Sequence, residues 1–238
     1  MTEERHWINL NGEKIALVLH YPPQGPWSCV VASHGLGASK DSEKYLLLSR
    51  EFSRAGFAFC RFDFRGCGES QGDYAETTIE GRIKDLQSVI RFLNGHRAMA
   101  GGVSLLGSSL GGFIALYCAA LEPEVRCVVT WNTPATLRGL RRELGGDLAG
   151  LGSAFFDELA RETFADAPKG VSRCLVIQGD QDEVVPPEHG EFLWKCAAEP
   201  KRLHMLRGAD HRLTNEEHRR EAVWESLNWI KQYYGAEQ

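Results

Sequence analysis

The sequence predicts an α/β fold with a mostly parallel, twisted sheet, an antiparallel hairpin at its N-terminus and helices on both faces. Two observations support this prediction. Short apolar runs alternate with helix-forming stretches over almost the whole chain, and polar or glycine-rich stretches follow the apolar runs. Because function in such sheets lies at the carboxyl ends of the strands, we expect these stretches to form one site. A chain of 238 residues has the size of one domain, so we expect residues 1–238 to form a single domain.

The composition excludes several classes of protein. The chain is 43% hydrophobic and 25% charged, which is typical of a folded chain rather than a disordered one. A formal net charge of −5 argues against a nucleic-acid partner and against binding to an anionic membrane surface. No stretch approaches the length of a membrane span, and the N-terminus has no apolar signal region, so we expect a cytoplasmic protein. Its oligomeric state, monomer or homodimer, stays open.

The seven cysteines predict neither a disulfide framework nor a metal site. Most of them lie inside apolar runs, as expected of small buried side chains in a reducing compartment. No CxxC pattern or Cys/His ligand spacing is present, so we expect no metal and no other cofactor. Cys67, in a glycine-rich turn, is expected to be the reactive cysteine.

The first half of the chain predicts four strands and two helices, and a hairpin turn joins the first two strands. Asn11-Gly12 is a strong two-residue turn signal between the two strands of a hairpin. Gly56 would end the first helix, and the second is amphipathic at helical spacing. We expect strands at 7–10, 14–20, 28–33 and 57–62, and helices from 41 or 42 to 55 and from 78 to 93.

The second half continues the alternation with one interruption. We expect strands at 103–106, 125–131, 174–178 and 203–206, and helices at 113–121, 188–197 and 216–233. The interval 132–173 is longer than one crossover helix requires. It predicts two or three short helices, with the crossover helix near 155–164 and a small helical cap at about 133–165. Alternatively, the leucines of this interval only seal the edge of the sheet.

Ser109 is the predicted nucleophile. The stretch Gly107-Ser108-Ser109-Leu110-Gly111 links an apolar strand to a helix-forming run, and a serine at such a sharp strand-to-helix turn has an exposed hydroxyl. The residues two positions on either side must be small, because strand and helix approach closely there. The N-terminal amides of the following helix would also favour an oxyanion.

His211 is the predicted base. It is the one histidine after Ser109 that follows the last strand in a loop, from which a base can reach the serine. His204 lies in a predicted strand, and His189 and His218 lie in predicted helices. His34 precedes the serine and is expected to brace its own loop.

Asp182 is the predicted carboxylate partner of His211. It lies just past the penultimate strand, and the chain order Ser, Asp, His fits a known arrangement. Asp180 remains the reserve candidate, and Glu183 lies in the same stretch. Asp210 is expected to bond nearby backbone amides of its own loop.

Two backbone amides are predicted to form the oxyanion hole. One belongs to Leu110, the residue after the nucleophile, and the other to Leu36, in the loop after the strand that ends at Ser33. A separate stretch, Asp63 to Ser70, is expected to form a salt-bridged turn that supports the site rather than taking part in chemistry.

These stretches together resemble the α/β-hydrolase superfamily. The resemblance is carried by His34 to Lys40, Asp63 to Ser70, Gly107 to Gly112, Gly179 to Pro186 and Gly208 to His211, in the family order. Within the superfamily, the short chain, the His-Gly-x-x-x-x-Lys loop and the modest cap are most like the cinnamoyl and feruloyl esterase-type serine hydrolases. The cap is shorter than in feruloyl esterases and lacks tyrosine.

The sequence therefore predicts a serine hydrolase that cleaves carboxylic esters through an acyl-enzyme, with Ser109, His211 and Asp182 as triad. The apolar cap predicts a medium-chain or bulky apolar acyl group. A thioesterase, an amidase or peptidase, and a monoacylglycerol lipase would use the same triad and remain alternatives, as does a non-catalytic ligand receptor on this fold. The expected partner is a small-molecule ester, and the expected substrate-binding residues are Leu137, Leu140, Leu144 and Val184.

Overall fold

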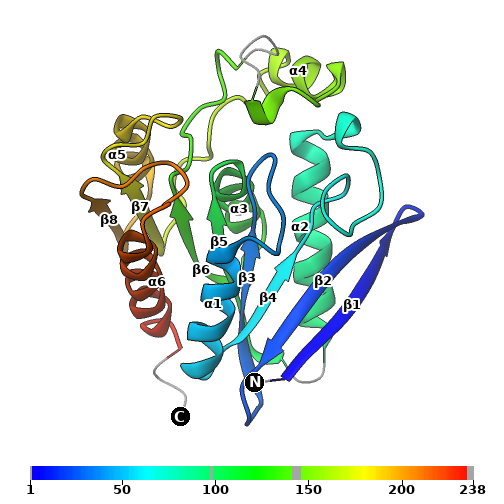
Figure 1. Cartoon of the computed structure of the whole chain (residues 1–238), viewed down its shortest axis with the longest axis vertical. Coiled ribbons are helices and arrows are strands. Elements are labelled where there is room, and N and C mark those ends of the chain that lie inside the picture. The colour runs from blue at the N-terminus through cyan, green and yellow to red at the C-terminus, as the bar shows by residue number, and fades with distance from the viewer. Residues whose placement is uncertain (1, 97–98, 141–145, 235–238) are drawn as a thin grey trace.

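One eight-stranded sheet forms the centre of the structure, a computed structural model that describes residues 2–96, 99–140 and 146–234. The strand order is β1-β2-β4-β3-β5-β6-β7-β8 (Figure 1). The pairs β1–β2 and β2–β4 are antiparallel, and all other pairs are parallel. The predicted mostly parallel sheet with an antiparallel hairpin is thus confirmed. The strands are β1 (Thr2–Leu10), β2 (Glu13–Tyr21), β3 (Trp27–Ser33), β4 (Ala58–Phe62), β5 (Met99–Ser108), β6 (Val125–Trp131), β7 (Cys174–Gly179) and β8 (Lys201–Leu206).

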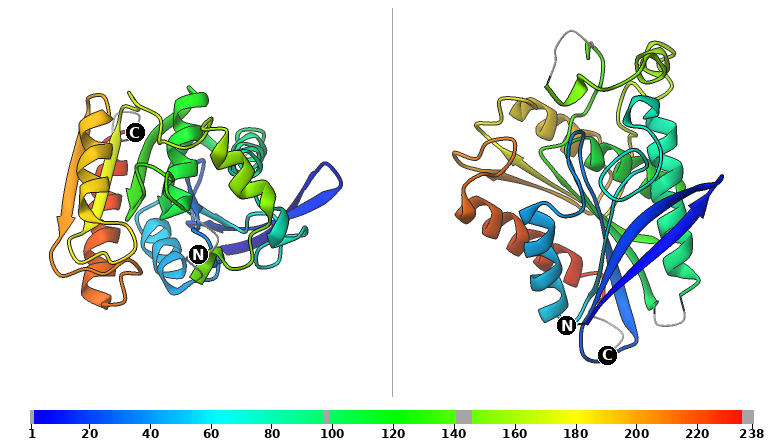
Figure 2. Two further views of the ribbon diagram at one scale, coloured as in Figure 1. Left: turned by 90° about the horizontal axis from the view of Figure 1, so that it is seen from above. Right: turned by 45° about the vertical axis from the view of Figure 1, so that its right-hand side comes forward.

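Helices cover both faces of this sheet (Figure 2). One face packs against α1 and α6, and the other packs against α2, α3 and α5. Helix α3 is apolar nearly all round, as expected for a helix buried between the sheet and its neighbours. The helices are α1 (Glu43–Arg54), α2 (Ile79–Asn94), α3 (Leu110–Leu121), α4 (Ser153–Ala160), α5 (Pro187–Cys196) and α6 (Glu216–Lys231), with short 3₁₀ turns η1 (Tyr74–Glu76) and η3 (Gly146–Leu148).

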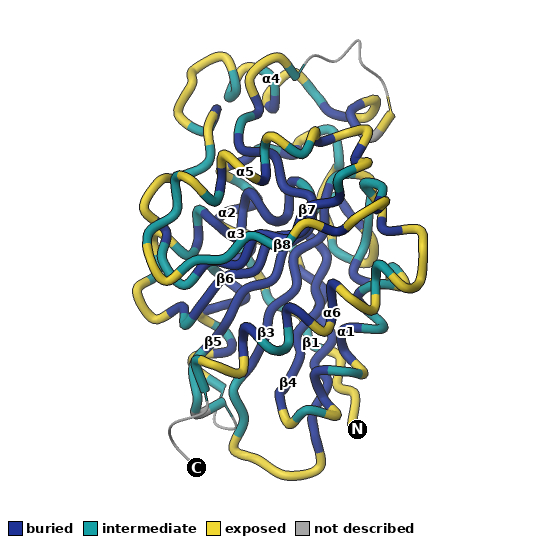
Figure 3. Tube along the Cα trace, turned by 90° about the vertical axis from the view of Figure 1, so that its left-hand side faces the viewer, coloured by how far each residue is buried: buried dark blue, intermediate teal, exposed yellow. Residues whose placement is uncertain are grey.

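The hydrophobic core consists of two layers, one on each face of the sheet. Figure 3 shows the strands as a continuous buried centre with exposure confined to the loops and outer helix faces. Phe113 and Leu86 belong to the layer under α2 and α3, whereas Phe52 and Trp229 belong to the layer under α1 and α6. Strands β3 to β7 are buried on both faces of the sheet. This burial explains why each of them is an apolar run that can be predicted from the sequence.

Two strands begin well before the positions that the sequence predicts. Strand β1 starts at Thr2 rather than at position 7, because its first residues are polar and exposed and so have no apolar alternation. Strand β5 starts at Met99 rather than at position 103, in a stretch that contains Gly101 and Gly102. Hydrophobic patterning detects buried strand residues, and these ends are held by backbone pairing instead.

The segment between β6 and β7, residues 132–173, differs from the predicted crossover. Helix α4 lies beyond the carboxyl ends of the strands, against η1 and the start of α2, and not along a face of the sheet (Figure 1). The carboxylate of Glu158 on α4 accepts hydrogen bonds from the amides of Ile79 and Glu80, the first residues of α2. The prediction of a crossover helix near 155–164 is therefore wrong, because this short helix caps the N-terminus of α2 instead.

The cysteines are all free, and six of the seven are buried. Cys67 is among the buried ones, and burial raises the pKa of its thiol, which disfavours the reactive thiolate. The prediction that Cys67 is the reactive cysteine is therefore wrong. Among the helices that the structure describes, none combines the length and the apolar character needed to cross a bilayer.

Candidate active site

Ser109 occupies a sharp turn between β5 and α3. Its backbone has φ 54° and ψ −131°, a conformation that L-residues rarely adopt, and its amide donates to the carbonyl oxygen of Trp131 over 2.9 Å. A Cβ atom on Gly111 would lie 2.2 Å from the carbonyl oxygen of Ser33, and one on Gly107 would lie 2.3 Å from that of Gly111. The close approach of strand and helix therefore requires glycine at both positions, as the sequence predicts.

The structure brings Ser109, His211 and Asp182 together from three loops. His211 Nε2 lies 3.1 Å from Ser109 Oγ, and His211 Nδ1 lies 2.8 Å and 3.0 Å from the two carboxylate oxygens of Asp182. Asp182 is buried, whereas Ser109 and His211 are partly exposed. These are the distances and the order of contacts by which a carboxylate orients a histidine toward a serine hydroxyl.

The loop after β7 holds the Asp182 carboxylate in place. Oδ1 accepts hydrogen bonds from the amides of Val184 (2.9 Å) and Val185 (2.7 Å). The side-chain amide of Gln178, at the end of β7, donates to Oδ2 over 3.3 Å and to the carbonyl oxygen of Val185 over 3.0 Å. The sequence does not predict this role of Gln178, because a polar residue inside an apolar strand gives no indication of its partner.

Asn132, directly after β6, connects three strand ends. Its side-chain nitrogen donates to the carbonyl oxygens of Asp210 (3.1 Å) and His211 (2.9 Å), and its oxygen accepts from the amide of Gly179 (2.8 Å). Its φ of 48° lies in the left-handed region, where asparagine is tolerated better than most residues. The sequence reasoning missed this residue too.

The other two aspartates have local partners. Asp180 accepts from the amide of Gly208 over 2.6 Å, and no contact joins its carboxylate to His211 in the part of the chain that the structure describes. Asp210 accepts from the amide and the hydroxyl of Thr214, both over 2.8 Å, as predicted for a loop carboxylate. Of the carboxylates considered from the sequence, the one beside the His211 imidazole is thus Asp182.

The loop after β3 lies against Ser109. A Cβ atom on Gly35 would lie 3.0 Å from Ser109 Cβ, so the backbone there passes close to the serine and leads directly to the amide of Leu36. Leu110 is the first residue of α3, and a helix leaves its first amides without partners inside the helix. Both residues border the space in front of Ser109, where the sequence predicts the oxyanion hole.

His34 braces this loop. Its Nδ1 is 2.8 Å from the carbonyl oxygen of Gly35, and its Nε2 accepts from the amide of Phe64 over 3.1 Å. Burial lowers its pKa to about 3, helped by the charge of Arg82, so the ring is neutral at physiological pH. A neutral ring can donate through one nitrogen and accept through the other, as this position requires.

The stretch from Asp63 to Ser70 is salt-bridged, as predicted, but the partners lie outside it. Asp63 Oδ2 lies 3.0 Å from Nζ of the buried Lys40, and Arg65 Nε lies 2.7 Å from Asp85 Oδ1. Glu13 also pairs with Arg65, over 2.9 Å. The ion pairs of Arg65 attach the turn to β2 and α2, and the turn lies against the loop that carries His34.

Two cavities meet at Ser109, and both are also lined by Leu36, His211 and Arg212. The first, here called the cap-side cavity, has a volume of about 540 Å³ and lies under the segment between β6 and β7. Its other lining residues are mostly apolar or uncharged and include Pro134, Thr136, Leu140, Leu148, Val184 and Val185.

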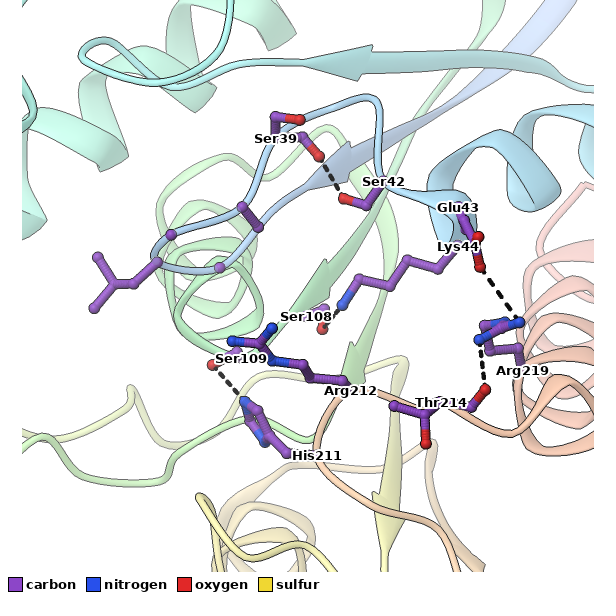
Figure 4. Close-up of a pocket in the computed structure, with 14 residues that line it drawn as sticks. Ser39, Ser42, Glu43, Lys44, Ser108, Ser109, His211, Arg212, Thr214 and Arg219 are labelled. Carbon is purple, nitrogen blue, oxygen red and sulfur yellow. Dashed lines mark hydrogen bonds and ion pairs between the residues drawn. The ribbon is translucent and has the colours of Figure 1, made fainter. Parts of the chain in front are cut away.

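The second, here called the α1-side cavity, has a volume of about 420 Å³ and lies between the loop after β3, the start of α1 and the loop after β8. Figure 4 shows Lys44 reaching from α1 toward Ser108, and Arg212 reaching toward Ser109. Lys44 Nζ donates to Ser108 Oγ over 2.7 Å. Neither cation was found from the sequence, because Lys44 lies in a predicted helix and Arg212 in a loop.

The predicted substrate-binding residues separate into three groups. Leu140 and Val184 line the cap-side cavity. Leu137 does not line it, because its amide bonds to the carbonyl oxygen of Ala165 over 2.7 Å and its side chain packs in the core, 2% exposed. Leu144 lies outside the described residues. Within the described part of the chain, no group of three or more His, Cys, Asp or Glu side chains is arranged to hold a metal ion.

Comparison with known proteins gives the following relatives. A family model described as serine aminopeptidase, S33, matches residues 24–141. The uncharacterized protein YfhR of Escherichia coli O157:H7 is 27% identical over 194 residues, which are 80% of this chain and 65% of that protein, so the chain spans about two thirds of this relative. The thermostable monoacylglycerol lipase of Bacillus sp. (strain H-257) is 24% identical over an alignment 242 positions long, which covers 90% of this chain and 94% of the lipase.

Among solved structures, Est1E from Butyrivibrio proteoclasticus, determined with bound ferulic acid, has a TM-score of 0.82. It is 18% identical, and the superposition covers 97% of this chain and 99% of that one. At this identity the likeness establishes a shared fold.

Proposed function

Because the chain belongs to the α/β-hydrolase superfamily, we propose that it is a serine hydrolase that cleaves small carboxylic esters through an acyl-enzyme. The single observation that carries this proposal is the contact chain from Asp182 through His211 to Ser109, with distances of 2.8 Å and 3.1 Å. A serine hydroxyl becomes a nucleophile only when a positioned base removes its proton.

In the proposed reaction, His211 Nε2 takes the proton of Ser109 Oγ while the oxygen attacks the ester carbonyl carbon. Asp182 holds the Nδ1–H of His211 and stabilises the imidazolium that forms. His211 then gives the proton to the leaving alcohol, which leaves Ser109 acylated. A water molecule, deprotonated by His211, attacks the acyl carbon, and His211 returns that proton to Ser109 Oγ as the bond between Oγ and the acyl carbon breaks and the carboxylic acid leaves.

The carbonyl oxygen gains negative charge during both attacks. We assign its stabilisation to the backbone amides of Leu36 and Leu110, aided by the positive end of the α3 dipole. His34 supports this assignment, because its two hydrogen bonds fix the loop that carries Leu36.

The cap-side cavity is the proposed acyl site. Its mostly apolar or uncharged lining suits a medium-chain or bulky apolar acyl group. In this proposal the segment at about 133–165 acts as the cap of a single domain and sets the acyl preference. Free cysteines in apolar surroundings fit a reducing compartment, and we propose a cytoplasmic location on that ground.

The test uses a fluorophosphonate probe and p-nitrophenyl esters on the purified protein. We expect Ser109→Ala to abolish both labelling and ester turnover, while the matched control Ser172→Ala keeps both. Labelling that persists in Ser109→Ala would refute the proposed nucleophile. Labelling without ester turnover in the wild type would favour the ligand-receptor alternative. Comparing kcat/KM for matched ester, thioester and amide substrates separates the esterase from the thioesterase and amidase alternatives.

A further inference from the structure

We propose that the α1-side cavity binds an anionic group, a carboxylate or a phosphate, on the alcohol half of the ester. This inference rests on the proposed function, because it assigns the two halves of a substrate whose carbonyl lies at Ser109. The two cavities meet at that residue, and the cap-side cavity is the proposed acyl site. The alcohol half therefore extends into the α1-side cavity.

Cationic side chains outnumber acidic ones in the lining of this cavity. Lys44, Arg212 and Arg219 come from α1, the loop after β8 and α6, and Glu43 is the one carboxylate among the lining residues that the structure describes. Arg219 Nη2 lies 3.5 Å from Glu43 Oε2, so this acid faces a guanidinium at the rim (Figure 4). The carboxylate of Glu43 is thus engaged by Arg219, and the ammonium of Lys44 has its hydrogen bond to the hydroxyl of Ser108.

Lys44 lies next to the reaction centre. Its ammonium donates to the hydroxyl of Ser108, the residue immediately before Ser109, over 2.7 Å. An ammonium group has three donors, so a ligand can be bound while this hydrogen bond remains. The burial of Lys44 and the charge of Arg212 both disfavour its protonation, and an anion between the two cations would relieve that cost.

The remaining lining groups also suit an anion. The hydroxyl of Ser39 accepts from the amide of Asp41 and can still donate its own hydrogen, and the N-terminus of α1 adds the positive end of a helix of 12 residues. The chain as a whole is acidic, with a formal net charge of −5. Its overall charge therefore opposes anion binding, and the local cations at this cavity are what would select the ligand.

Matched esters test the proposal. All carry the same butyryl group, and the alcohol half is phenol with a meta carboxylate, a meta phosphate or, as neutral isostere, a meta carboxamide. For the wild type we expect kcat/KM for at least one anionic ester to exceed that for the carboxamide at least tenfold. The two anionic esters distinguish a carboxylate ligand from a phosphate ligand.

Two variants probe the cations independently. In Lys44→Met and in Arg212→Gln we expect the anionic-to-neutral ratio of kcat/KM to fall at least threefold, and to fall to about one in the double variant. The control Lys84→Met changes an exposed lysine on α2 and should keep the wild-type ratio. Thermal unfolding curves verify that each variant is folded, and Arg212 is exposed enough to be replaced without loss of core packing.

A wild-type ratio of one or less for both anionic esters would overturn the proposal, as would a ratio unaffected by either variant. A gain that appears only when the carboxylate is moved to the acyl half, as in phenyl glutarate, would overturn the assignment to the alcohol half. The carboxamide ester distinguishes these failures from failure of the proposed function, because its Ser109-dependent hydrolysis needs no anion site.

Discussion

The side-chain amide of Asn132 donates to the carbonyl oxygen of His211 over 2.9 Å. The same side chain accepts from the amide of Gly179, three residues before Asp182. One residue at the end of β6 therefore ties together the two loops that bring the proposed base and its carboxylate to Ser109. We regard Asn132 as a positioning residue, since its side-chain hydrogen bonds join it to the backbone of Asp210, His211 and Gly179.

Asn132→Ala should loosen the loop of His211. We expect kcat/KM to fall by about 10- to 100-fold and the free energy of unfolding by about 1–3 kcal/mol. Asn132→Gly accommodates the φ of 48° without strain and should lose similar activity. If the glycine variant keeps full activity, the loss of kcat/KM in the alanine variant is caused by backbone strain and not by the lost hydrogen bonds. Asn94→Ala, at an exposed position on α2, is the control.

The two aspartates after β7 should differ strongly in importance. Asp182→Asn removes the charge beside His211 and should reduce kcat on the order of 10³- to 10⁴-fold. Asp180→Asn removes a charge that has no contact with His211 in the described part of the chain and keeps an oxygen that can accept from the amide of Gly208, so it should cost less than about tenfold. Steady-state kinetics on an activated ester measures both. The opposite order of effects would mean that Asp180 is the acid.

Gly111 should tolerate no side chain. Its Cβ would lie 2.2 Å from the backbone oxygen of Ser33, which cannot move without distorting β3. We expect Gly111→Ala to lower the free energy of unfolding by more than about 3 kcal/mol or to prevent folding. Gly95→Ala is the matched control, because its Cβ would have only ordinary contacts, the nearest at 3.5 Å. Denaturant unfolding of both variants tests this, and a small effect at Gly111 would contradict the close strand–helix contact.

His34 should make the protein sensitive to acid. Burial holds its folded-state pKa at about 3, below the ordinary value of 6.5, so below pH 6.5 the unfolded chain binds a proton that the folded chain does not. This contribution to stability is present above pH 6.5 and is lost as the pH falls, by about 1.4 kcal/mol per pH unit. Between pH 7 and pH 5 the free energy of unfolding should therefore fall by about 2 kcal/mol more in the wild type than in His34→Gln. An equal fall in both proteins would refute this assignment.

The preference for anionic over neutral esters should weaken at alkaline pH. Burial and the charge of Arg212 lower the pKa of Lys44 to about 8. Among the described residues that line the cavity, the other charged or titratable groups are Arg219, Glu43 and His211. Lys44 is charged below that pH, so the anionic-to-neutral ratio of kcat/KM should fall as the pH rises through 8, with a midpoint shifted upward by the bound anion. Any pH dependence of the catalytic steps that both esters share cancels in this ratio. In Lys44→Met the ratio should be constant from pH 7 to pH 9.5.

Much of the fold could be predicted because its signals are local. Buried strands are apolar runs, and strand ends carry the polar stretches that meet at Ser109. The triad residues also follow from position, since each lies just past a predicted strand. Confirmation of their roles needs the experiments above.

Other features depend on contacts distant in sequence. No local pattern indicates that Glu158 would cap α2, and so α4 was expected as a crossover helix. Leu137 and Leu140 share helical spacing, yet one packs in the core and the other lines a cavity, because a turn at 138–139, closed by the hydrogen bond from the amide of Leu140 to the carbonyl oxygen of Leu137, lies between them. The charge of the α1-side cavity arises from three separate elements and is invisible in any one stretch.

The two cavities at Ser109 have a consequence for how this enzyme class diversifies. Their lining residues come largely from different stretches, the segment between β6 and β7 for one and the loop after β3 with the start of α1 for the other. Substitutions in one stretch leave the other stretch intact. Preference for the two halves of a substrate can thus evolve, or be engineered, as independent modules around an unchanged reaction centre.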